Sequence, residues 1–242
     1  MRRSGFQFTL LTLSAAAAAY SRTAVGPLQE SMRAALALSD YQMALLQGPA
    51  LAIPLVLAAI PLGLLIDRYS RARLLCAFAV IDLIGSAATA LVTDFWILFL
   101  TRCLVGLMVT AISTTCFSML SDMYPPARRG RASMVVVIGQ FGGMSAAFAC
   151  GGWLLRVGSS GQESWRWALL WLTSPLLLVS LTTVFMREPP RTGQAVENPS
   201  LRQTWMELRQ RMEVRSRTKQ RPADKHLALR QRRHTMLPGR AA

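Results

Sequence analysis

Three ionisable side chains interrupt long apolar runs of this sequence: Arg22, Asp82 and Arg102. A charge inside a lipid bilayer is costly, so such residues face a protein interior or a water-filled cavity and are candidates for solute binding or proton transfer. Asp82 and Arg102 should lie at depths that differ by less than about 10 Å in a hydrocarbon core about 30 Å thick. We therefore expect a structural ion pair between them, with a proton relay as the alternative. If Arg22 and Arg102 lie without nearby acids, they would favour an anionic or polar solute.

A second charged cluster ends an apolar run of more than twenty residues. The stretch "GLLIDRYSRARLL", residues 63–75, places Asp67 beside Arg68, Arg71 and Arg73. Arginines at the inner surface of a membrane are each attracted to anionic lipid by roughly 1 kcal/mol, and this explains them simply. It does not explain the acid, which opposes that attraction. We expect Asp67 to act as a latch that pairs with the local Arg68 and Arg71, or with Arg128 or Arg129.

The elements that must position these residues are membrane helices. The chain has 242 residues, of which 52% are hydrophobic and 16% charged, whereas a soluble domain carries about a quarter charged residues. A spanning helix needs about 20 apolar residues, and lipid excludes open strand edges. The composition therefore predicts an all-α membrane protein with six transmembrane helices, at about 6–25, 41–66, 74–92, 95–120, 132–155 and 165–186.

Basic residues gather in alternate loops. Arginines stand before the first span, in residues 68–73, in residues 128–131 and after the sixth span, and the other loops hold far fewer. The positive-inside rule predicts that both termini are cytoplasmic, in the cell (plasma or inner) membrane. Arg2 and Arg3 before an apolar run could suggest a signal peptide, but the run is too long, so we expect an uncleaved helix.

Residues 192–242 differ in composition from the rest of the chain. They hold twelve Lys or Arg against four Asp or Glu, which is over half of the net charge of +15. We expect a basic cytoplasmic linker or tail. Leu201, Trp205, Leu208 and Met212 recur at helical spacing, which predicts a short basic amphipathic helix at the membrane surface. A disordered tail is the alternative.

The remaining chemistry-bearing residues give no sign of an enzyme. Four cysteines, at positions 76, 103, 116 and 150, fall within spans without metal-type spacing, so we expect them to be small packing residues. His226 and His234 lie in the tail without partners of a catalytic or metal-binding pattern. The glycines of "GQFGG", residues 139–143, suit close helix packing rather than phosphate binding. We expect no enzymatic activity, no cofactor and no metal.

The 63–75 segment resembles the signature loop of the major facilitator superfamily, Gly-x-Leu-x-Asp-Arg-x-Gly-Arg-Arg/Lys. Gly63, Leu65, Asp67, Arg68 and Arg71 fall on that pattern, whereas Ser70 and Ala72 depart from it and Arg73 comes one place late. "RCLVGLMVTA", residues 102–111, resembles the signature of the fourth helix, and "SDMYPPARRGRA", residues 121–132, resembles the loop after it. The resemblance implies that residues 63–73 latch the two halves of a transporter at its cytoplasmic side.

Among branches of this family, the chain is most similar to the spinster-type transporters. The similarity rests on "YSRTAVGPLQESMRAALALSDYQMALLQG", residues 20–48. In that branch an acid precedes the arginine of the first helix, and a glutamate follows the fourth-helix glycine by three residues. Ser21 and Val109 stand at those places here, so both usual proton carriers are replaced and Asp82 is the one acid left deep in a predicted span.

A complete facilitator has twelve helices, with the solute site between two six-helix halves. Residues 1–191 look like the N-terminal half, and no seventh apolar run follows. We expect a half of a carrier for a small organic solute, from a truncated or frame-shifted coding region or an evolved half-transporter, completed by a missing second half or by self-association. The alternatives are a membrane-anchored module whose basic tail binds anionic lipid or nucleic acid through charge alone, or a non-functional fragment. No specific nucleic-acid partner is expected.

Overall fold

The computed structural model describes residues 2–157, 164–186 and 206. The chain divides into two units, Met1–Thr192 and Gly193–Ala242, and the fold below is that of the first. Of the second unit only Met206 is described. The predicted amphipathic helix at 201–212 and the basic tail therefore lie outside the described residues, apart from Met206.

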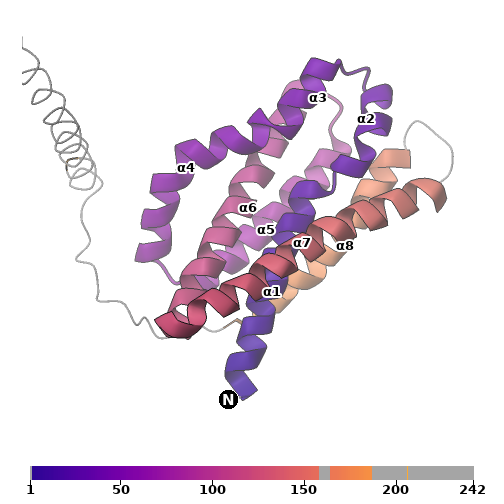
Figure 1. Ribbon diagram of the computed structural model, residues 1–242. Helices are drawn as coiled ribbons and strands as arrows, with labels where there is room; N and C mark the ends of the chain where they lie inside the picture. Colours follow the sequence, from indigo (N-terminus) through magenta and orange to yellow (C-terminus); the bar gives the residue numbers. More distant parts are fainter. Residues whose placement is uncertain (1, 158–163, 187–205, 207–242) are drawn as a thin grey trace, which may run out of the picture. The chain divides into compact units, whose positions relative to one another are not determined.

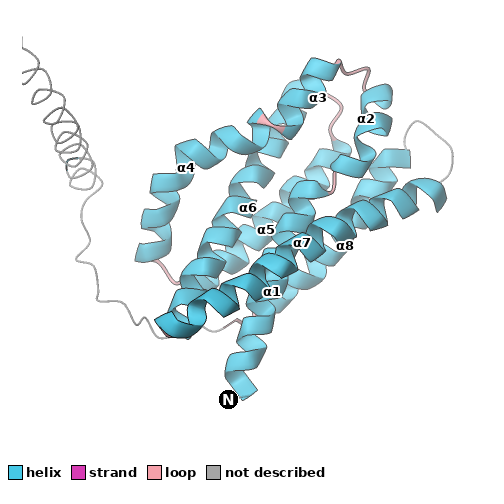
Figure 2. Ribbon diagram, in the orientation of Figure 1, coloured by secondary structure: helices cyan, strands magenta, loops and turns pink. Residues whose placement is uncertain are grey.

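The described residues form helices joined by short loops, with no strand among them (Figure 2). The helices are α1 (Arg2–Thr23), the 3-10 helix η1 (Gly26–Leu28), α2 (Gln29–Ala35), α3 (Asp40–Gln47), α4 (Pro49–Arg68), α5 (Arg71–Leu91), α6 (Phe95–Met123), α7 (Pro126–Val157) and α8 (Ser164–Thr183). In Figure 1, α1 runs beside α7 and α8, while α6 packs between α5 and α4. The fold is all-α, as the composition predicts.

Four helical stretches are long and apolar enough to cross a membrane: Asp40–Arg68, Arg71–Leu91, Phe95–Met123 and Pro126–Val157. They coincide with the four predicted spans at 41–66, 74–92, 95–120 and 132–155. The first and last predicted spans fall on α1 and α8, which are helices of 22 and 20 residues. The count of six spans remains a prediction.

The predicted span at 41–66 is two helices rather than one. Gly48 closes α3 and opens α4 with φ −101° and ψ −83°, outside the helical region. Pro49 follows at the first position of α4, where its missing N–H leaves no intrahelical bond unmade. Ser39 opens α3 with a capping box, in which its hydroxyl accepts from the Gln42 N–H and its own N–H donates to the Gln42 side chain.

Glycines on one face of α7 allow α1 to approach closely. Gly139, Gly143 and Gly151 recur at multiples of four positions along α7, so they share that face. A Cβ added at Gly139 would lie 2.8 Å from Cγ2 of Thr12, and one at Gly143 would collide with the backbone carbonyl of Ala16. Small residues of this kind let membrane helices pack backbone to backbone. The α1–α7 contact therefore depends on glycine, which has no Cβ, at positions 139 and 143.

Buried apolar side chains gather in two clusters. One surrounds Leu11, Leu75 and Met119, and the other surrounds Leu28 and Trp165. Along α5 and α6 the buried side chains between the two clusters are polar or charged, with Gly85 among them. These residues are Asp82, Ser86 and Thr89 on α5 and Arg102 on α6. A buried polar layer thus crosses the helix bundle between its two apolar halves.

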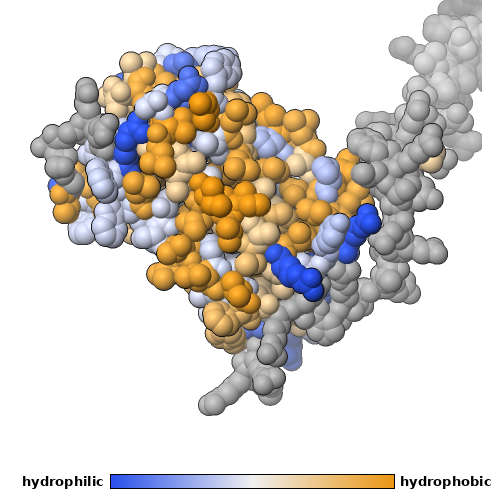
Figure 3. Space-filling model, turned by 180° about the vertical axis from the view of Figure 1, so that it is seen from behind, coloured by the Kyte–Doolittle hydropathy of each residue, from blue (hydrophilic) through white to orange (hydrophobic). Residues whose placement is uncertain are grey.

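The outside of the bundle is largely apolar. Figure 3 shows hydrophobic residues over much of one face, with hydrophilic residues mainly toward its ends. Large apolar side chains such as Val56, Leu57, Ile138 and Leu178 are exposed. A soluble monomer rarely exposes so large an apolar surface, whereas a bilayer covers it with lipid.

The α1–α7 contact generates a first prediction. Gly143→Ala should destabilise the protein by about 1–3 kcal/mol, because the added methyl group forces the two backbones apart. Gly142→Ala is the matched control, since a Cβ at that neighbouring position would have no atom within 4 Å. Thermal unfolding of the purified chain in detergent measures both. Equal melting temperatures for the two variants would contradict the backbone-to-backbone contact.

A second prediction concerns the end of α2. Ala37 has a φ of 50°, the one positive φ among the described non-glycine residues, and the Leu38 N–H reaches back to the Arg33 carbonyl at 3.0 Å. This is the left-handed helix ending that glycine favours. Ala37→Gly should stabilise the protein by about 0.5–1 kcal/mol. It removes a left-handed strain of about 1–2 kcal/mol, and the greater unfolded-state entropy of glycine offsets part of that gain.

The control for that substitution is Ala34→Gly, which lies inside α2. The same chemical change should there destabilise the protein by about 0.5–1 kcal/mol. Opposite shifts of the melting temperature are therefore expected for the two variants. Shifts of the same sign would refute the assignment of Ala37 to a strained helix end.

Candidate functional site

The acid predicted to lie deep in a span is held by serines. Asp82 on α5 is 3% exposed. The Ser21 hydroxyl of α1 donates to Asp82 Oδ1 at 3.1 Å, and Ser21 Oγ lies 2.9 Å from Ser86 Oγ. Ser21 has one hydroxyl proton and gives it to Asp82, so Ser86 is the donor in the second bond. A hydrogen-bonded chain therefore runs from Ser86 through Ser21 to the carboxylate.

Arg102 lies in the same polar layer but bonds elsewhere. It is 2% exposed, and one terminal nitrogen of its guanidinium donates to the Arg22 carbonyl at 3.1 Å. Its Nε has no hydrogen-bond partner among the described residues. The ion pairs found within 4 Å in the described part of the chain do not include Arg102 with Asp82. The expected direct ion pair is therefore absent, although Arg102 acts electrostatically on Asp82 over a longer distance.

Each of the two charged groups instead has its hydrogen-bond partner on α1. Ser21 donates to Asp82, and the carbonyl of the next residue, Arg22, accepts from the guanidinium of Arg102. The sequence argument considered only the depths of the two side chains and could not include these partners on a third helix.

Arg22 faces a cavity on the other side of α1. The cavity has a volume of about 150 Å³ and is lined by α1, α6 and α7. Its polar residues are Arg22, Ser113 and Gln140, and the Gln140 amide donates to Ser113 Oγ at 3.4 Å. The apolar lining consists of Ala19, Val109, Phe141 and Met144. A single exposed cation, two hydrogen-bonding groups and an apolar wall can hold a small solute with an anionic or polar group.

The predicted latch residues surround the junction of α4 and α5. Arg71 forms an ion pair with Asp122 at the end of α6, and it also donates to the Ser118 carbonyl at 3.4 Å. Asp67 lies 3.9 Å from Arg71. Arg71 and Asp122 are 12% and 10% exposed, whereas Asp67 is 72% exposed. The largely buried ion pair between Arg71 and Asp122 therefore joins α5 to α6, and the exposed Asp67 lies at the edge of this ion pair.

The other latch residues lie apart from this ion pair. The Arg68 guanidinium lies over the Tyr69 ring at 5.9 Å, and Arg73 is exposed. Gly63 lies inside α4, where an added Cβ would meet no atom within 4 Å. Arg129, one of the arginines considered as a partner of Asp67, donates its Nε to the Tyr124 carbonyl at 2.9 Å.

Sequence reasoning missed several members of these sites. Ser21 was noted only as the replacement of an acid, and Ser86 was not noted. Asp122 lay within a segment used for the family resemblance but was given no role. Ser113 and Gln140 carry no distinctive spacing, so only the packing of α6 against α7 reveals them. An acid at the end of an apolar run, next to a predicted basic loop, was the one signal that could have pointed to Asp122.

The four cysteines are unpaired, and their exposure ranges from buried Cys116 to exposed Cys150. Within residues 2–157 and 164–186, no group of three or more His, Cys, Asp or Glu side chains is arranged to hold a metal ion.

Comparison with solved structures supports the fold. A crystal structure of a bacterial homolog to the human lysosomal transporter Spinster, inward-facing and unoccupied, matches 78% of this chain and 44% of its own, with a TM-score of 0.68 and 25% identity. The proton:xylose symporter XylE matches 76% of this chain and 45% of its own with a TM-score of 0.66, at 17% identity. The latter likeness is one of fold alone.

Sequence relatives agree with the structural ones. Protein spinster homolog 1 of Homo sapiens is 31% identical over 189 residues, which cover 71% of this chain and 33% of the relative. The D-xylose transporter of Levilactobacillus brevis is 28% identical over 137 residues, which cover 56% of this chain and 29% of the relative. The chain thus spans about a third of the length of these relatives. The similarity to spinster-type proteins is confirmed. Residues 11–229 match the Major Facilitator Superfamily, and the chain belongs to that family.

Proposed function

We propose that this chain forms one wall of a carrier for a small organic anion, with Arg22 as the residue that binds the anionic group. The observation that carries the proposal is the cavity of about 150 Å³ in which Arg22 lies beside Ser113 and Gln140. Among the relatives named above, the D-xylose transporter is by its name a carrier of a small organic solute, which supports a carrier role. In facilitators the solute site lies near the bilayer midplane between two six-helix halves. We infer that α1–α8 are one such half and that another six-helix unit supplies the opposite wall.

Charge is the reason for preferring an anion. Arg102 is buried and Asp82 interacts with it electrostatically, so these two groups balance each other within the polar layer. Arg22 is exposed and lines the cavity. A carboxylate or phosphate group would accept charge-assisted hydrogen bonds there. The apolar wall formed by Phe141 and Met144 suits an organic body attached to that group.

Asp82 and Arg102 are proposed as coupling residues. The serine chain from Ser86 to Asp82 lies on α1 and α5, and Arg102 bonds to the backbone of the residue that lines the cavity. A change in the charge of Asp82 would therefore act on α1, which carries Arg22. The usual proton carriers of the spinster-type pattern are replaced by Ser21 and Val109, which leaves Asp82 as the candidate for that role.

We further propose that both ends of the chain are cytoplasmic. The arginine bias of alternate loops supports this orientation. The α4–α5 junction then lies at the cytoplasmic surface, with Gly63, Asp67, Arg68, Arg71 and Arg73 as a conformational latch. In that arrangement the α2–α3 region faces outward.

Binding of matched solutes tests the role of Arg22. Benzoate should bind the purified chain in lipid nanodiscs, and uncharged benzamide of similar size should bind at least about tenfold more weakly. Arg22→Ala should weaken benzoate binding by about tenfold or more, because a hydrogen-bonded charge pair is lost. Arg22→Lys should retain part of the affinity, and Arg33→Ala on α2 is the control for loss of a positive charge. Equilibrium binding of radiolabelled solute measures each. Benzoate binding that is unchanged by Arg22→Ala would exclude this residue as the anion site.

The latch generates a separate prediction on stability. Asp122→Asn should lower the free energy of unfolding by about 1–3 kcal/mol, since it removes the charge that faces the largely buried Arg71. Asp67→Asn should cost about 0–1 kcal/mol, because its carboxylate is mostly in solvent. Thermal unfolding of the two variants in detergent compares them directly. A larger loss for Asp67→Asn would show that Asp67, and not Asp122, is the principal partner.

A further inference from the structure

A small cavity lies beside Asp82, among residues of α1, α5, α6 and α8. Its volume is about 10 Å³, which is the space of one particle of the size of a water molecule. Its polar lining consists of Ser14 on α1, Asp82 on α5 and Ser180 on α8, and its other lining residues are apolar. It shares no lining residue with the Arg22 cavity. Oxygen-bearing side chains from three helices therefore surround one very small space.

These side chains offer the cavity hydrogen-bond acceptors and no donor. Each serine hydroxyl gives its one proton to a backbone carbonyl four residues earlier in its own helix, at 2.8 Å for Ser14 and 2.7 Å for Ser180. Their oxygens keep a lone pair for a ligand. Asp82 accepts from Ser21 through Oδ1, and none of the hydrogen bonds between described residues reaches its Oδ2. The free positions are thus one carboxylate oxygen and two hydroxyl oxygens.

The surrounding protein does not compensate the free carboxylate oxygen. Asp82 is 3% exposed, and Ser14 and Ser180 are also buried. A buried acceptor without a donor costs free energy, and the cost is larger for a charged group. Arg102 acts on Asp82 electrostatically, but its guanidinium bonds to the Arg22 carbonyl and it does not line the cavity. Only an occupant of the cavity can therefore contact Asp82 Oδ2 directly.

A set of acceptors without donors favours a cation as the occupant. A water molecule would donate to two of the oxygens, but its own lone pairs would meet no donor in the cavity. A cation is attracted by all three oxygens at once, and the carboxylate supplies a full negative charge. The Ala79 carbonyl accepts from Ser180 Oγ at 3.2 Å, and Ala79 is itself a lining residue. This carbonyl adds a fourth oxygen at the edge of the cavity.

The number of ligands and the volume of the cavity determine which cation fits. Ca²⁺ takes about six to eight oxygen ligands, and Mg²⁺ requires octahedral geometry and usually keeps several bound waters. A space of about 10 Å³ cannot hold such waters, and its lining provides a single carboxylate. A monovalent ion suits this smaller set of ligands. Na⁺ is smaller than K⁺, so Na⁺ fits the cavity better and approaches the oxygens more closely.

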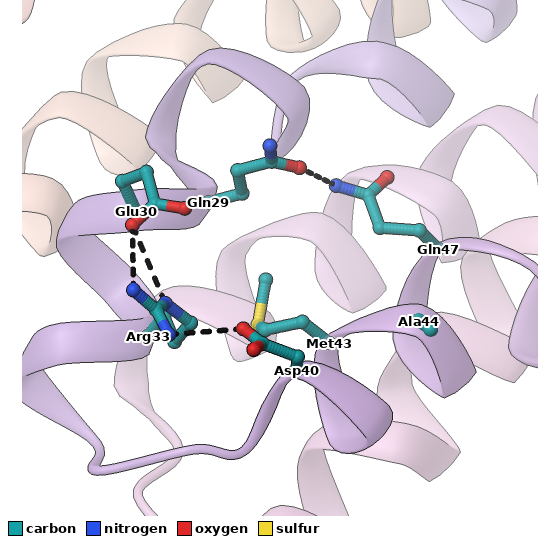
Figure 4. Close-up of a pocket in the computed structure, with 7 residues that line it drawn as sticks. All are labelled: Gln29, Glu30, Arg33, Asp40, Met43, Ala44 and Gln47. Atoms are coloured by element: carbon teal, nitrogen blue, oxygen red, sulfur yellow. Dashed lines mark hydrogen bonds and ion pairs between the residues drawn. The ribbon is translucent and has the colours of Figure 1, made fainter.

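The carboxylates between α2 and α3 lack these properties. Glu30 and Asp40 lie beside a cavity of about 290 Å³ and share Arg33 as their partner (Figure 4). Their side chains are 74% and 90% exposed, so water solvates them without any ion. Asp82 differs because it is enclosed and one of its oxygens has no donor. Asp40 therefore offers a matched control for the loss of a carboxylate.

We propose that Asp82, Ser14 and Ser180 form a binding site for one Na⁺ ion, with the Ala79 carbonyl as a further ligand. The ion connects α1, α5 and α8 through their oxygen atoms. The site itself does not depend on the Arg22 cavity. Its consequence for transport rests on the proposed function: Na⁺ would occupy the residue that is proposed there for coupling, and would thus link the carrier to a sodium gradient.

Thermal unfolding of the purified full chain in detergent tests the site in NaCl, KCl and choline chloride at equal concentration. NaCl should raise the melting temperature by about 2–4 °C over choline chloride, once its concentration exceeds the dissociation constant about fivefold. KCl should raise it less. Asp82→Asn should abolish the rise, because the carboxylate charge is lost. Ser180→Ala should weaken binding of radiolabelled Na⁺ about fivefold, since one ligand oxygen is removed.

Three control variants should keep the full response to Na⁺. Asp40→Asn removes an exposed carboxylate, Ser174→Ala removes an exposed serine hydroxyl of α8, and Arg22→Ala changes the other cavity. If Ser180→Ala fails to fold, Ser14→Ala removes the other hydroxyl ligand. Because Na⁺ is measured without any organic solute, its failure to bind is a result separate from benzoate binding at Arg22.

Each other outcome overturns the proposal. Equal melting temperatures in the three salts would mean that the cavity holds no Na⁺, and an equal rise in NaCl and KCl would exclude selection by size. A response to Na⁺ that persists in Asp82→Asn, or is lost in Asp40→Asn, would place the ion at another carboxylate. Unchanged Na⁺ affinity in a folded Ser180→Ala or Ser14→Ala variant would contradict the assignment of the serine ligands.

Discussion

The described bundle depends on how closely α1 can approach α7. Gly139 and Gly143 of α7 bring the backbone of α1 to a distance at which no side chain fits between them. Dispersion contacts and close packing hold such helices together in lipid, where no hydrophobic force acts between them. Successive residues of a helix point in different directions. The contact with α7 fixes the rotation of α1 and therefore which neighbour each of its residues contacts. Ser21 meets α5, and Arg22 lines the cavity formed with α6 and α7.

The polar layer is the costly part of this arrangement. A buried charge without partners is penalised by several kcal/mol, and both Asp82 and Arg102 are almost fully buried. Hydroxyl and carbonyl groups offset part of that cost, since Ser21 donates to the acid and the Arg22 carbonyl accepts from the guanidinium. A core built for stability alone would place apolar side chains here, as it does on both sides of the layer. Two buried charges between two apolar clusters are thus the part of the core that packing alone does not explain.

Much of the helical architecture could be predicted from the sequence, because apolar run length reports directly on membrane helices. The four spans from Asp40 to Val157 follow from composition. The break at Gly48 does not follow from run length, because it falls inside one long apolar run, and the Gly48-Pro49 pair is its local signal. Local signals fail for contacts between distant residues. Arg71 and Asp122 are 51 positions apart, and Asp82 and Arg102 each bond to α1 rather than to each other. The positions of charged residues in and beside the apolar runs identified the candidate residues. Helix packing determined which of these residues contact each other.

The hydrogen bond from Arg102 to the Arg22 carbonyl also stabilises the C-terminal end of α1. α1 ends at Thr23, so the Arg22 carbonyl belongs to the last turn, whose carbonyls lack donors within the helix. The Arg102 guanidinium satisfies one of them and brings positive charge to the negative end of the α1 dipole. Arg102 is thus a C-terminal cap supplied by another helix. Removing its charge would loosen the turn that carries Arg22, so Arg102 helps to position a residue of the cavity without lining the cavity itself.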